Sequence, residues 1–379
     1  MYSAYINSVP APGNPRRRAG DAQAMTHTVT LISRDSGEEH QIEVAEGETV
    51  LEAALRHGLH IPYGCRNGSC GSCRARVLSG RVAYPREWPP ALTREQAEQG
   101  DVLLCRALPE RDLALEPRRI MATPEGFRPR RRSARVARLE RICHDVMGLY
   151  LKLPPSNRLQ FRAGQYLDIL LRDGRRRSFS MANAPHEDAL VELQVRRVDG
   201  GRYTNQIFAR MKPKTTLQIE APLGDFFLRE DSDRPIIMIG GGTGFAPLKS
   251  MLMDMFHRGI GRPVHLYWGV RALRDLYMAD WIEVQMGRQE GLRFTPVLSE
   301  PHPGDGWAGR TGLVHRAVLD DYGDLSGHEV YISGPPTMIG AARPAFTARG
   351  LPEERLFCES FEWARDRPLA GLWPARGRF

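Results

Sequence analysis

Four cysteines are the residues of this chain whose types and spacing best suit redox chemistry. Cys65, Cys70 and Cys73 follow the spacing C-x4-C-x2-C, and Cys105 lies 32 positions after Cys73. This is the plant-type spacing for a [2Fe–2S] cluster, in which one short loop supplies three thiolates and a distant segment supplies the fourth. Glycines in the loop permit a tight backbone path, and its free amides can hydrogen-bond to the sulfurs and help set the potential.

The other uses of these cysteines fit the pattern less well. Structural zinc sites are usually built from paired C-x2-C units, and the chain has a single such pair, Cys70 and Cys73. Cys143 and Cys358 lie outside the pattern, and we interpret each as a small apolar residue rather than a ligand or a redox thiol. The sequence therefore predicts one iron–sulfur cluster held by four cysteines.

A second segment has the pattern of a phosphate-binding turn. Residues 236–247, IIMIGGGTGFAP, read as an apolar strand, a glycine turn and the start of a helix. Such a turn points backbone amides and a helix N-terminus at a pyrophosphate. The pattern departs from the strict G-x-G-x-x-G fingerprint, so a purely structural turn remains an alternative. Two further segments, residues 177–180 (RSFS) and 201–204 (GRYT), are weak signals when taken alone.

Three folded units are expected to position these residues. The 379 residues suffice for two or three domains. In residues 26–108, two short strands precede a helix whose start carries a capping box, Thr49 with Glu52. Residues 134–233 contain many short strands punctuated by glycine and proline, which is typical of an antiparallel barrel. In residues 234–363, apolar strands alternate with helices, which indicates a parallel α/β sheet.

The remaining segments are expected to lie outside these units. Residues 109–133 are rich in proline and arginine and are predicted to be a linker, either a solvated charged run or a docking surface for an acidic partner or domain. Residues 1–25 and 364–379 are predicted to be tails, the first of them disordered. The formal net charge is +8, and much of the basic excess lies in the predicted linker. Because the excess is local, we do not expect nucleic-acid binding.

Composition excludes several other classes of protein. No apolar run approaches the ~18 residues that a membrane-spanning helix needs, and arginines near the N-terminus are not followed by the apolar core of a secretory signal. Six cysteines are too few for a disulfide-dense secreted scaffold. We therefore expect a cytoplasmic protein without a membrane span.

Taken in their order along the chain, the motifs resemble one known family. The cysteine loop, the barrel, R-x-F-S, G-x-x-T, G-G-G-T-G and a late G-P-P resemble the ferredoxin-NADP reductase superfamily with an N-terminal plant-type ferredoxin. The resemblance covers about residues 26–363. It is greatest to CDP-6-deoxy-glucoseen reductases and to the electron-transfer reductase components of oxygenases, through residues 61–73 (IPYGCRNGSCGSC), 177–185 (RSFSMANAP) and 359–362 (ESFE). It implies a multidomain fold: an α+β β-grasp ferredoxin domain, an antiparallel β-barrel flavin domain and an α/β parallel-sheet nucleotide-binding domain.

The resemblance also implies roles for residues of the flavin domain. In the family's R-x-Y-S motif, the arginine binds flavin phosphate, the aromatic residue packs on the flavin and the serine hydroxyl faces flavin N5. Arg177, Phe179 and Ser180 match those positions, and Phe179 lacks the hydroxyl of the usual tyrosine. Gly201 and Thr204 match a G-x-x-S/T segment whose amides hold the FAD pyrophosphate.

The nucleotide domain is matched in the same way. The resemblance assigns the nicotinamide-dinucleotide loop to Gly240, Gly241, Gly242, Thr243 and Gly244. A C-G-P-P motif near the nicotinamide corresponds to Ser333, Gly334 and Pro335, with serine in place of cysteine. Glu359 and Phe361 match a C-terminal segment near the isoalloxazine. On this basis Ser180 and Glu359 are the predicted catalytic residues.

The predicted function follows from these cofactors. NADH delivers two electrons as a hydride, and a [2Fe–2S] cluster takes one electron at a time. A flavin can exchange two electrons together or one at a time, so it can link the two. The resemblance implies NADH as donor, with NADPH as the alternative, and FAD rather than FMN. The acceptor is expected to be a separate protein, either a sugar-nucleotide 3-dehydrase or the oxygenase component of a ring-hydroxylating dioxygenase or multicomponent monooxygenase. A free-flavin reductase and a redox-sensing scaffold are the competing interpretations.

Overall fold

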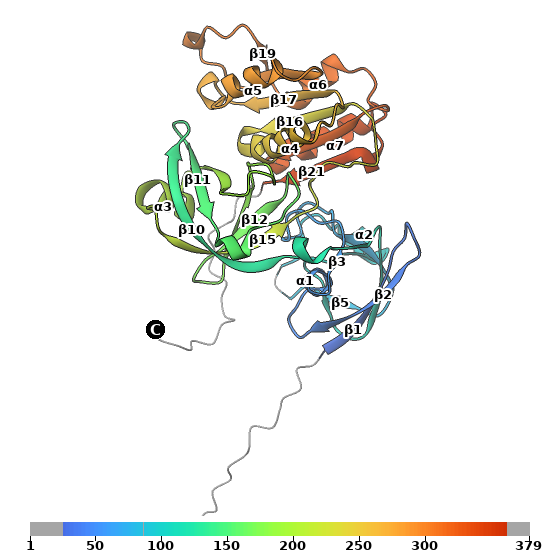
Figure 1. The fold of residues 1–379 in the computed structure, drawn as a ribbon. Coiled ribbons are helices and arrows are strands. Elements are labelled where there is room, and N and C mark those ends of the chain that lie inside the picture. Colours follow the sequence, from blue (N-terminus) through green and yellow to red (C-terminus); the bar gives the residue numbers. More distant parts are fainter. Residues whose placement is uncertain (1–25, 86, 362–379) are drawn as a thin grey trace, which may run out of the picture.

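The computed structural model describes residues 26–85 and 87–361, which form three units (Figure 1). In the first unit, a five-stranded sheet in the order β2-β1-β8-β4-β6 packs against a short helix, α1. The strands β1 and β8 run parallel at its centre, and the β1–β2 hairpin is antiparallel. This is the expected β-grasp arrangement. The elements are β1 (Thr26–Ile32), β2 (Glu39–Ala45), α1 (Val50–Arg56), β3 (Leu59–His60), β4 (Arg74–Ser79), β5 (Val82–Ala83), α2 (Arg94–Glu98), β6 (Asp101–Leu103), β7 (Leu108–Pro109), β8 (Leu113–Pro117) and β9 (Met121–Ala122).

The predicted linker over residues 109–133 is wrong for most of its length. The strand β8 occupies the middle of the first sheet, where Leu113 and Leu115 are buried opposite Val29 and Leu31 of β1. The strand β9 pairs with β3, and β10 already begins at Arg130. In the sequence, the alternating leucines of β8 stand among prolines and arginines. Their partner strand β1 lies more than 80 residues earlier, so the pairing is not visible as a local pattern. The first unit therefore extends well beyond residue 108.

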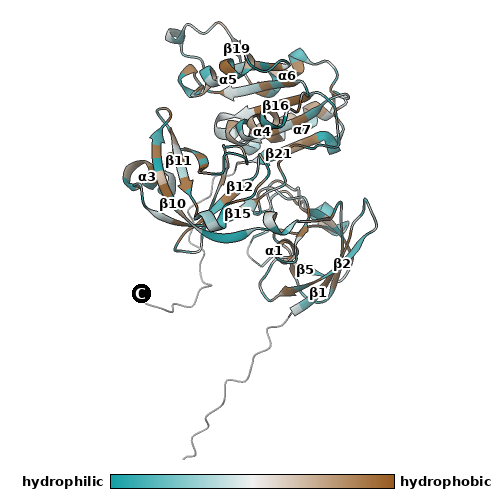
Figure 2. Cartoon of the chain, viewed as in Figure 1, coloured by the Kyte–Doolittle hydropathy of each residue, from teal (hydrophilic) through white to brown (hydrophobic). Residues whose placement is uncertain are grey.

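The second unit is an antiparallel sheet in the order β13-β12-β15-β10-β11-β14. A bridge between Met181, just after β13, and Leu193 of β14 joins the two edge strands and closes the barrel. Every second residue of β10 is buried from Arg132 to Val136, so this strand has one face in the barrel core (Figure 2). The elements are β10 (Arg130–Arg141), β11 (Val146–Lys152), β12 (Tyr166–Leu170), β13 (Arg176–Ser180), β14 (Val191–Arg196), α3 (Arg202–Arg210) and β15 (Thr216–Leu223).

The third unit is a parallel sheet in the order β19-β18-β17-β16-β20-β21 with helices on its faces (Figure 1). The order reverses beside β16, so the carboxyl ends of β16 and β20 form the switch point where ligands bind in such sheets. The elements are β16 (Ile236–Gly241), α4 (Phe245–Arg258), β17 (Val264–Val270), α5 (Ala279–Met286), β18 (Leu292–Leu298), β19 (Arg310–Thr311), α6 (Val314–Asp321), β20 (Glu329–Gly334), α7 (Pro336–Thr347) and β21 (Leu356–Ser360). Short 3₁₀ turns, η1–η6, include η3 (Gly242–Gly244) and η4 (Leu273–Asp275).

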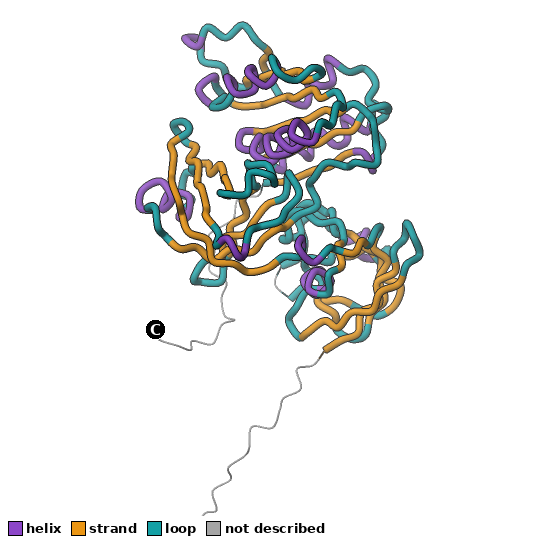
Figure 3. The backbone as a smooth tube through the Cα atoms, in the orientation of Figure 1, coloured by secondary structure: helices purple, strands orange, loops and turns teal. Residues whose placement is uncertain are grey.

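The apolar cores show how the units are joined. Ala163, Phe226 and Leu228 of the barrel belong to the same hydrophobic cluster as one face of the nucleotide sheet, so these two units form one body. The first unit has a hydrophobic cluster of its own. Loops rather than regular elements fill the region where the three units meet (Figure 3). Within the described residues, no helix has the length and apolar character to cross a membrane. The tails predicted for residues 1–25 and 364–379, and residues 362–363 of the third unit, lie outside the described residues.

Candidate functional site

One cavity of about 1430 Å³ lies where the three units meet. Its volume exceeds the ~300–1,000 Å³ of an ordinary small-ligand pocket, so it has room for more than one cofactor. Each unit supplies predicted site residues to its wall: Cys65 and Cys105 from the first, Arg177, Phe179, Ser180, Gly201 and Thr204 from the barrel, and Gly241, Gly242, Thr243, Pro335, Glu359 and Phe361 from the third.

The four predicted cluster cysteines lie in two adjacent pairs. The amides of Ser69 and Cys70 each donate to Cys65 Sγ over 3.3 Å, and the Cys65 amide donates to Cys70 Sγ over 3.5 Å. Contact with the Cys65 thiol lowers the pKa of Cys70 to about 6, and contact with the Cys105 thiol raises the pKa of Cys73. Each iron of a [2Fe–2S] cluster takes two protein thiolates. Two thiol pairs beside donating amides fit that requirement.

The predicted flavin residues follow one another along β13. Phe179 lies 6.5 Å, between ring centroids, from Tyr203, the second residue of α3. The Tyr203 hydroxyl is buried and has no hydrogen-bond partner among the described residues. Burial raises the pKa of Tyr203 to about 12, although the nearby Arg177 cation lowers it. A buried hydroxyl normally has a hydrogen-bond partner. Because Tyr203 lines the cavity, its hydroxyl can donate to a bound polar ligand such as FAD.

Gly201 and Thr204 shape the start of α3. The Thr204 hydroxyl accepts from the Val198 amide over 3.2 Å, so it stabilises the turn. A Cβ on Gly201 would lie 2.8 Å from that hydroxyl oxygen. The first amides of α3 have no intrahelical partner and lie at the positive end of the helix dipole, which suits a phosphate.

The glycine turn after β16 packs tightly against the turn after β20. A Cβ on Gly244 would overlap the Ser333 carbonyl oxygen, and one on Gly241 would lie 2.9 Å from Pro335 Cδ. Gly334 has φ +153°, and a Cβ on it would lie 3.1 Å from Gly241 Cα. Only glycine permits these approaches. They hold η3 and the start of α4 at the switch point, which is where sheets of this kind bind a pyrophosphate.

The two predicted catalytic residues are in direct contact across two units. Ser180 Oγ, at the end of β13, donates to Glu359 Oε2 of β21 over 2.9 Å. The Ser333 hydroxyl lies 3.5 Å from the same oxygen. Burial raises the pKa of Glu359 to about 8, although both hydroxyls lower it. This carboxyl is therefore neutral at pH 7 and can hold a proton at the cavity wall.

Arg66 is a site residue that the sequence reasoning missed. It follows Cys65 directly, has φ +56° and is only 12% exposed. Its guanidinium lies 3.4 Å from Asp168 of β12 and 3.6 Å from Glu220 of β15. Nearby, Tyr166 Oη donates to the Gly64 carbonyl over 2.8 Å. The cluster loop is thus fixed to the barrel by polar contacts. Tyr203 was also missed, although its place between Gly201 and Thr204 was a signal.

Comparison with known proteins decides the family. Three domain families match the chain: the 2Fe-2S iron-sulfur cluster binding domain at residues 33–110, the oxidoreductase FAD-binding domain at 133–228 and the oxidoreductase NAD-binding domain at 238–344. The CDP-6-deoxy-L-threo-D-glycero-4-hexulose-3-dehydrase reductase of Yersinia pestis is 39% identical over 317 residues, 83% of this chain and 93% of that protein. The chain belongs to the ferredoxin-NADP reductase superfamily. This reductase is an NAD(P)H-dependent oxidoreductase with FAD and a [2Fe–2S] cluster, as the sequence predicted.

Other relatives are similar over most of their length. Reductase component 1 of terephthalate 1,2-dioxygenase from Comamonas is 36% identical, over 84% of this chain and 93% of its own length. Among solved structures, the cytochrome P450 reductase GcoB of Amycolatopsis is 34% identical with a TM-score of 0.76, over 89% of this chain and 99% of that one. The predicted fold class is therefore confirmed. The roles predicted for individual site residues stay predictions. The structure brings most of those residues to the wall of one cavity, whereas Cys70, Cys73, Gly240, Gly244, Ser333 and Gly334 do not line it.

Proposed function

We propose that the reductase takes electrons from NADH on FAD and passes them one at a time through the [2Fe–2S] cluster to a separate acceptor protein. The observation that carries the proposal is the shared cavity, whose wall contains cluster cysteines, the β13 flavin motif and the β16 glycine turn. FAD, when bound, supplies the exchange between two-electron and one-electron chemistry. The protein supplies binding, orientation and the local charge.

In this proposal each type of contact has a separate task. Arg177 and the amides at the start of α3 bind the flavin phosphates, and the amides of η3 and α4 bind the nicotinamide dinucleotide. The Ser180 hydroxyl and the neutral Glu359 carboxyl hold a proton at the wall of the cavity that would hold the cofactors. Arg66 positions the cluster loop against the barrel, so that Cys65 faces the cavity.

The acceptor we propose first is a 3-dehydrase acting on a sugar nucleotide. The support is the 39% identity to the Yersinia pestis protein, whose name describes it as the reductase of such a dehydrase. The reaction would take place in the cytoplasm, where NADH is supplied and where six cysteines without a disulfide are expected.

An oxygenase is the second candidate acceptor. Reductase component 1 of terephthalate 1,2-dioxygenase is 36% identical and the Amycolatopsis P450 reductase is 34% identical over most of both chains. These identities are close to that of the dehydrase reductase, so overall identity alone does not distinguish the two acceptors.

The experiment is an anaerobic assay of the purified reductase with NADH and one acceptor at a time. A CDP-hexulose dehydrase is expected to form deoxygenated sugar at a rate that depends on the reductase, and a dioxygenase component is expected to remain oxidised. Faster reduction of the dioxygenase component would favour the second candidate. Rapid NADH oxidation that requires added free FAD and reduces neither protein would contradict the proposal and favour a free-flavin reductase.

A further inference from the structure

The strand β14 lies between the barrel core and the nucleotide unit. Three of its residues are buried in the hydrophobic core of the barrel: Val191, Leu193 and Val195. Because successive side chains of a strand point to opposite faces, the other three form one outward row: Glu192, Gln194 and Arg196. Each side chain of this β14 row contacts a different residue of the nucleotide unit. The row is therefore a polar seam between the two units.

At the start of the row, Glu192 pairs with Lys249 of α4. Lys249 Nζ lies 2.8 Å from Glu192 Oε2 and donates to the Ala182 carbonyl over 3.1 Å. The next residue of α4 adds a bond from Ser250 Oγ to the Asn183 carbonyl over 2.6 Å. Lys249 is only 5% exposed, so its charge depends on these partners. Both accepting carbonyls come just after β13, so α4 joins the glycine turn at its own start to the strand of the predicted flavin motif.

Further along the row, Gln194 and Arg196 contact the segment that contains η4. Tyr277 Oη donates to Gln194 Oε1 over 2.8 Å, and Arg196 Nη2 lies 3.7 Å from Asp275 Oδ1. A Cβ added to Gly242 of the glycine turn would lie 2.6 Å from Arg196 Nη1, so this guanidinium is also beside the turn. Gln194 and Arg196 both line the cofactor cavity. This end of the row therefore lies where the two units face the cofactors.

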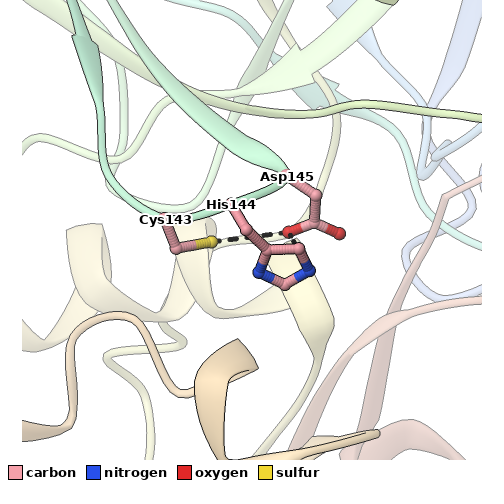
Figure 4. A group of neighbouring side chains, drawn as sticks. All are labelled: Cys143, His144 and Asp145. Atoms are coloured by element: carbon pink, nitrogen blue, oxygen red, sulfur yellow. Dashed lines mark hydrogen bonds and ion pairs between the residues drawn. The ribbon is translucent and has the colours of Figure 1, made fainter.

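The β10–β11 turn fixes the orientation of Arg196. Arg196 Nε donates to Asp145 Oδ2 over 2.6 Å. Figure 4 shows Cys143 and His144 beside the other oxygen of this carboxylate, with Sγ and Nε2 at 3.4 and 3.8 Å from Oδ1. Although burial raises it, the Arg196 cation holds the pKa of Asp145 below its usual value, so the ion pair is intact at pH 7. Arg196 is thus held by the barrel on one side and by Asp275 on the other.

We propose that the β14 row, with Lys249 and Tyr277 as its partners, sets how closely the nicotinamide approaches the flavin. These are positioning residues, because they act through the two units rather than on the reacting atoms. The glycine turn belongs to one unit and the flavin motif to the other, so a shift at their seam changes that approach. A displacement of about 1 Å can cost about 100-fold in rate. The inference rests on the proposed function, in which NADH passes a hydride, with both of its electrons, to FAD and becomes NAD⁺.

The first test compares two lysine substitutions in the full chain with FAD and the cluster bound. Lys249→Met removes the cation from Glu192, and Lys152→Met, at an exposed position of β11, is the matched control. Rapid mixing with NADH should show a limiting rate of flavin reduction about 10- to 100-fold lower in Lys249→Met. The dissociation constant of NADH should change less than about threefold, because the glycine turn is untouched. Lys152→Met should match the wild type in both values.

A milder pair of substitutions separates positioning from folding. Tyr277→Phe loses the hydroxyl that bonds to Gln194. Tyr322→Phe loses a hydroxyl that lies 2.9 Å from His265 Nδ1, within the nucleotide unit. Only Tyr277→Phe should slow flavin reduction, by about two- to tenfold, the equivalent of one hydrogen bond. Equal losses in the two variants would overturn the proposal, because they would reflect the stability of the nucleotide unit alone.

An absorbance titration adds a readout that does not depend on turnover. NAD⁺ stacked on reduced flavin absorbs at long wavelength, so adding NAD⁺ to the reduced enzyme without oxygen reports the approach of the two rings. The band should be weaker in Lys249→Met and Tyr277→Phe than in the wild type and both controls. Wild-type rates with a wild-type band in these two variants would overturn the proposal, and so would unchanged rates with weaker NADH binding. A wild-type flavin that NADH does not reduce would instead contradict the proposed function.

Discussion

Arg66 of the cluster loop places its guanidinium 3.4 Å from the Asp168 carboxylate of the barrel, a contact between residues 102 positions apart. Asp168 is 4% exposed at its side chain, and burial raises its pKa although Arg66 lowers it. The ion pair lies next to Cys65, so it fixes the distance between the first cluster cysteine and the flavin-binding strands. Among the described residues, the ferredoxin unit shares no apolar cluster with the barrel, which makes this polar contact important for docking.

Arg66→Ala should therefore slow electron transfer between the flavin and the cluster. Loss of a charge-assisted contact costs roughly 1.5–3 kcal/mol, so we expect NADH-driven reduction of cytochrome c to fall about tenfold. Ferricyanide reduction, which does not need the cluster, should change less than twofold. Arg76→Ala alters an exposed arginine of β4 in the same unit and serves as the control. Equal losses in both assays would show that Arg66 supports folding rather than docking.

Cys70→Ala should remove the cluster and leave the flavin in place. The barrel and the nucleotide unit share a hydrophobic cluster that contains no residue of the ferredoxin unit, so they should stay folded. Ferricyanide reduction by NADH should survive, and delivery of single electrons to cytochrome c should fall sharply. Iron analysis and the flavin spectrum check the two cofactors. Loss of flavin together with the cluster would contradict this modular account.

Arg177→Ala should weaken the retention of flavin, and the flavin released by denaturation should be FAD. Arg177 lies beside the orphaned Tyr203 hydroxyl and near the start of α3, which together offer a cation and amides for two phosphates. A contact of this kind is worth roughly 1.5–3 kcal/mol, or about 10- to 150-fold in affinity. Chromatography identifies the flavin, and titration of flavin-free protein gives the affinity. Arg172→Ala, an exposed neighbour, is the control. Recovery of FMN alone, or an unchanged affinity, would be contrary results.

The rate of flavin reduction by NADH should fall as the pH rises through about 8. Below that pH the Glu359 carboxyl is neutral, since burial raises its pKa to about 8. Above it, a buried negative charge opposes the arrival of electrons, and a unit charge ~4 Å away is worth ~4 kcal/mol at an effective dielectric constant of ~20. Rapid-mixing kinetics at several pH values measure the inflection. Glu359→Gln should remove it, whereas Glu354→Gln, at an exposed site, should keep it. An unchanged inflection in Glu359→Gln would show that the Glu359 carboxyl is not the group whose titration slows flavin reduction.

NADH should be preferred to NADPH. A site for the 2′-phosphate of NADPH needs cations beyond the second strand of the sheet. Two arginines follow β17, and of these Arg271 lines the cavity whereas Arg274 does not. We expect the specificity constant to be higher for NADH, and Arg271→Ala to lower the value for NADPH more than that for NADH. Steady-state kinetics with both nucleotides decide this. A higher specificity constant with NADPH would contradict the prediction.

The sequence predicted those parts of the site that depend on short-range patterns. The spacing of Cys65, Cys70 and Cys73 and the glycine turn after β16 are local signals, and so is the capping box of α1, where Glu52 N donates to Thr49 Oγ1 over 3.2 Å. The strand β8 was missed because its partner β1 lies far away in sequence. Arg66 was missed for the same reason, since its partners Asp168 and Glu220 come from another unit.

The central claim is the order of electron transfer, from NADH through FAD and the [2Fe–2S] cluster to an acceptor. Anaerobic rapid mixing with NADH, followed by flavin absorbance and by the electron paramagnetic resonance signal of the reduced cluster, tests it most directly. The account predicts that the flavin is reduced first and that the cluster signal appears afterwards, fast enough to support reduction of the acceptor protein. A cluster that remains oxidised while the protein turns over NADH and reduces that acceptor would contradict it.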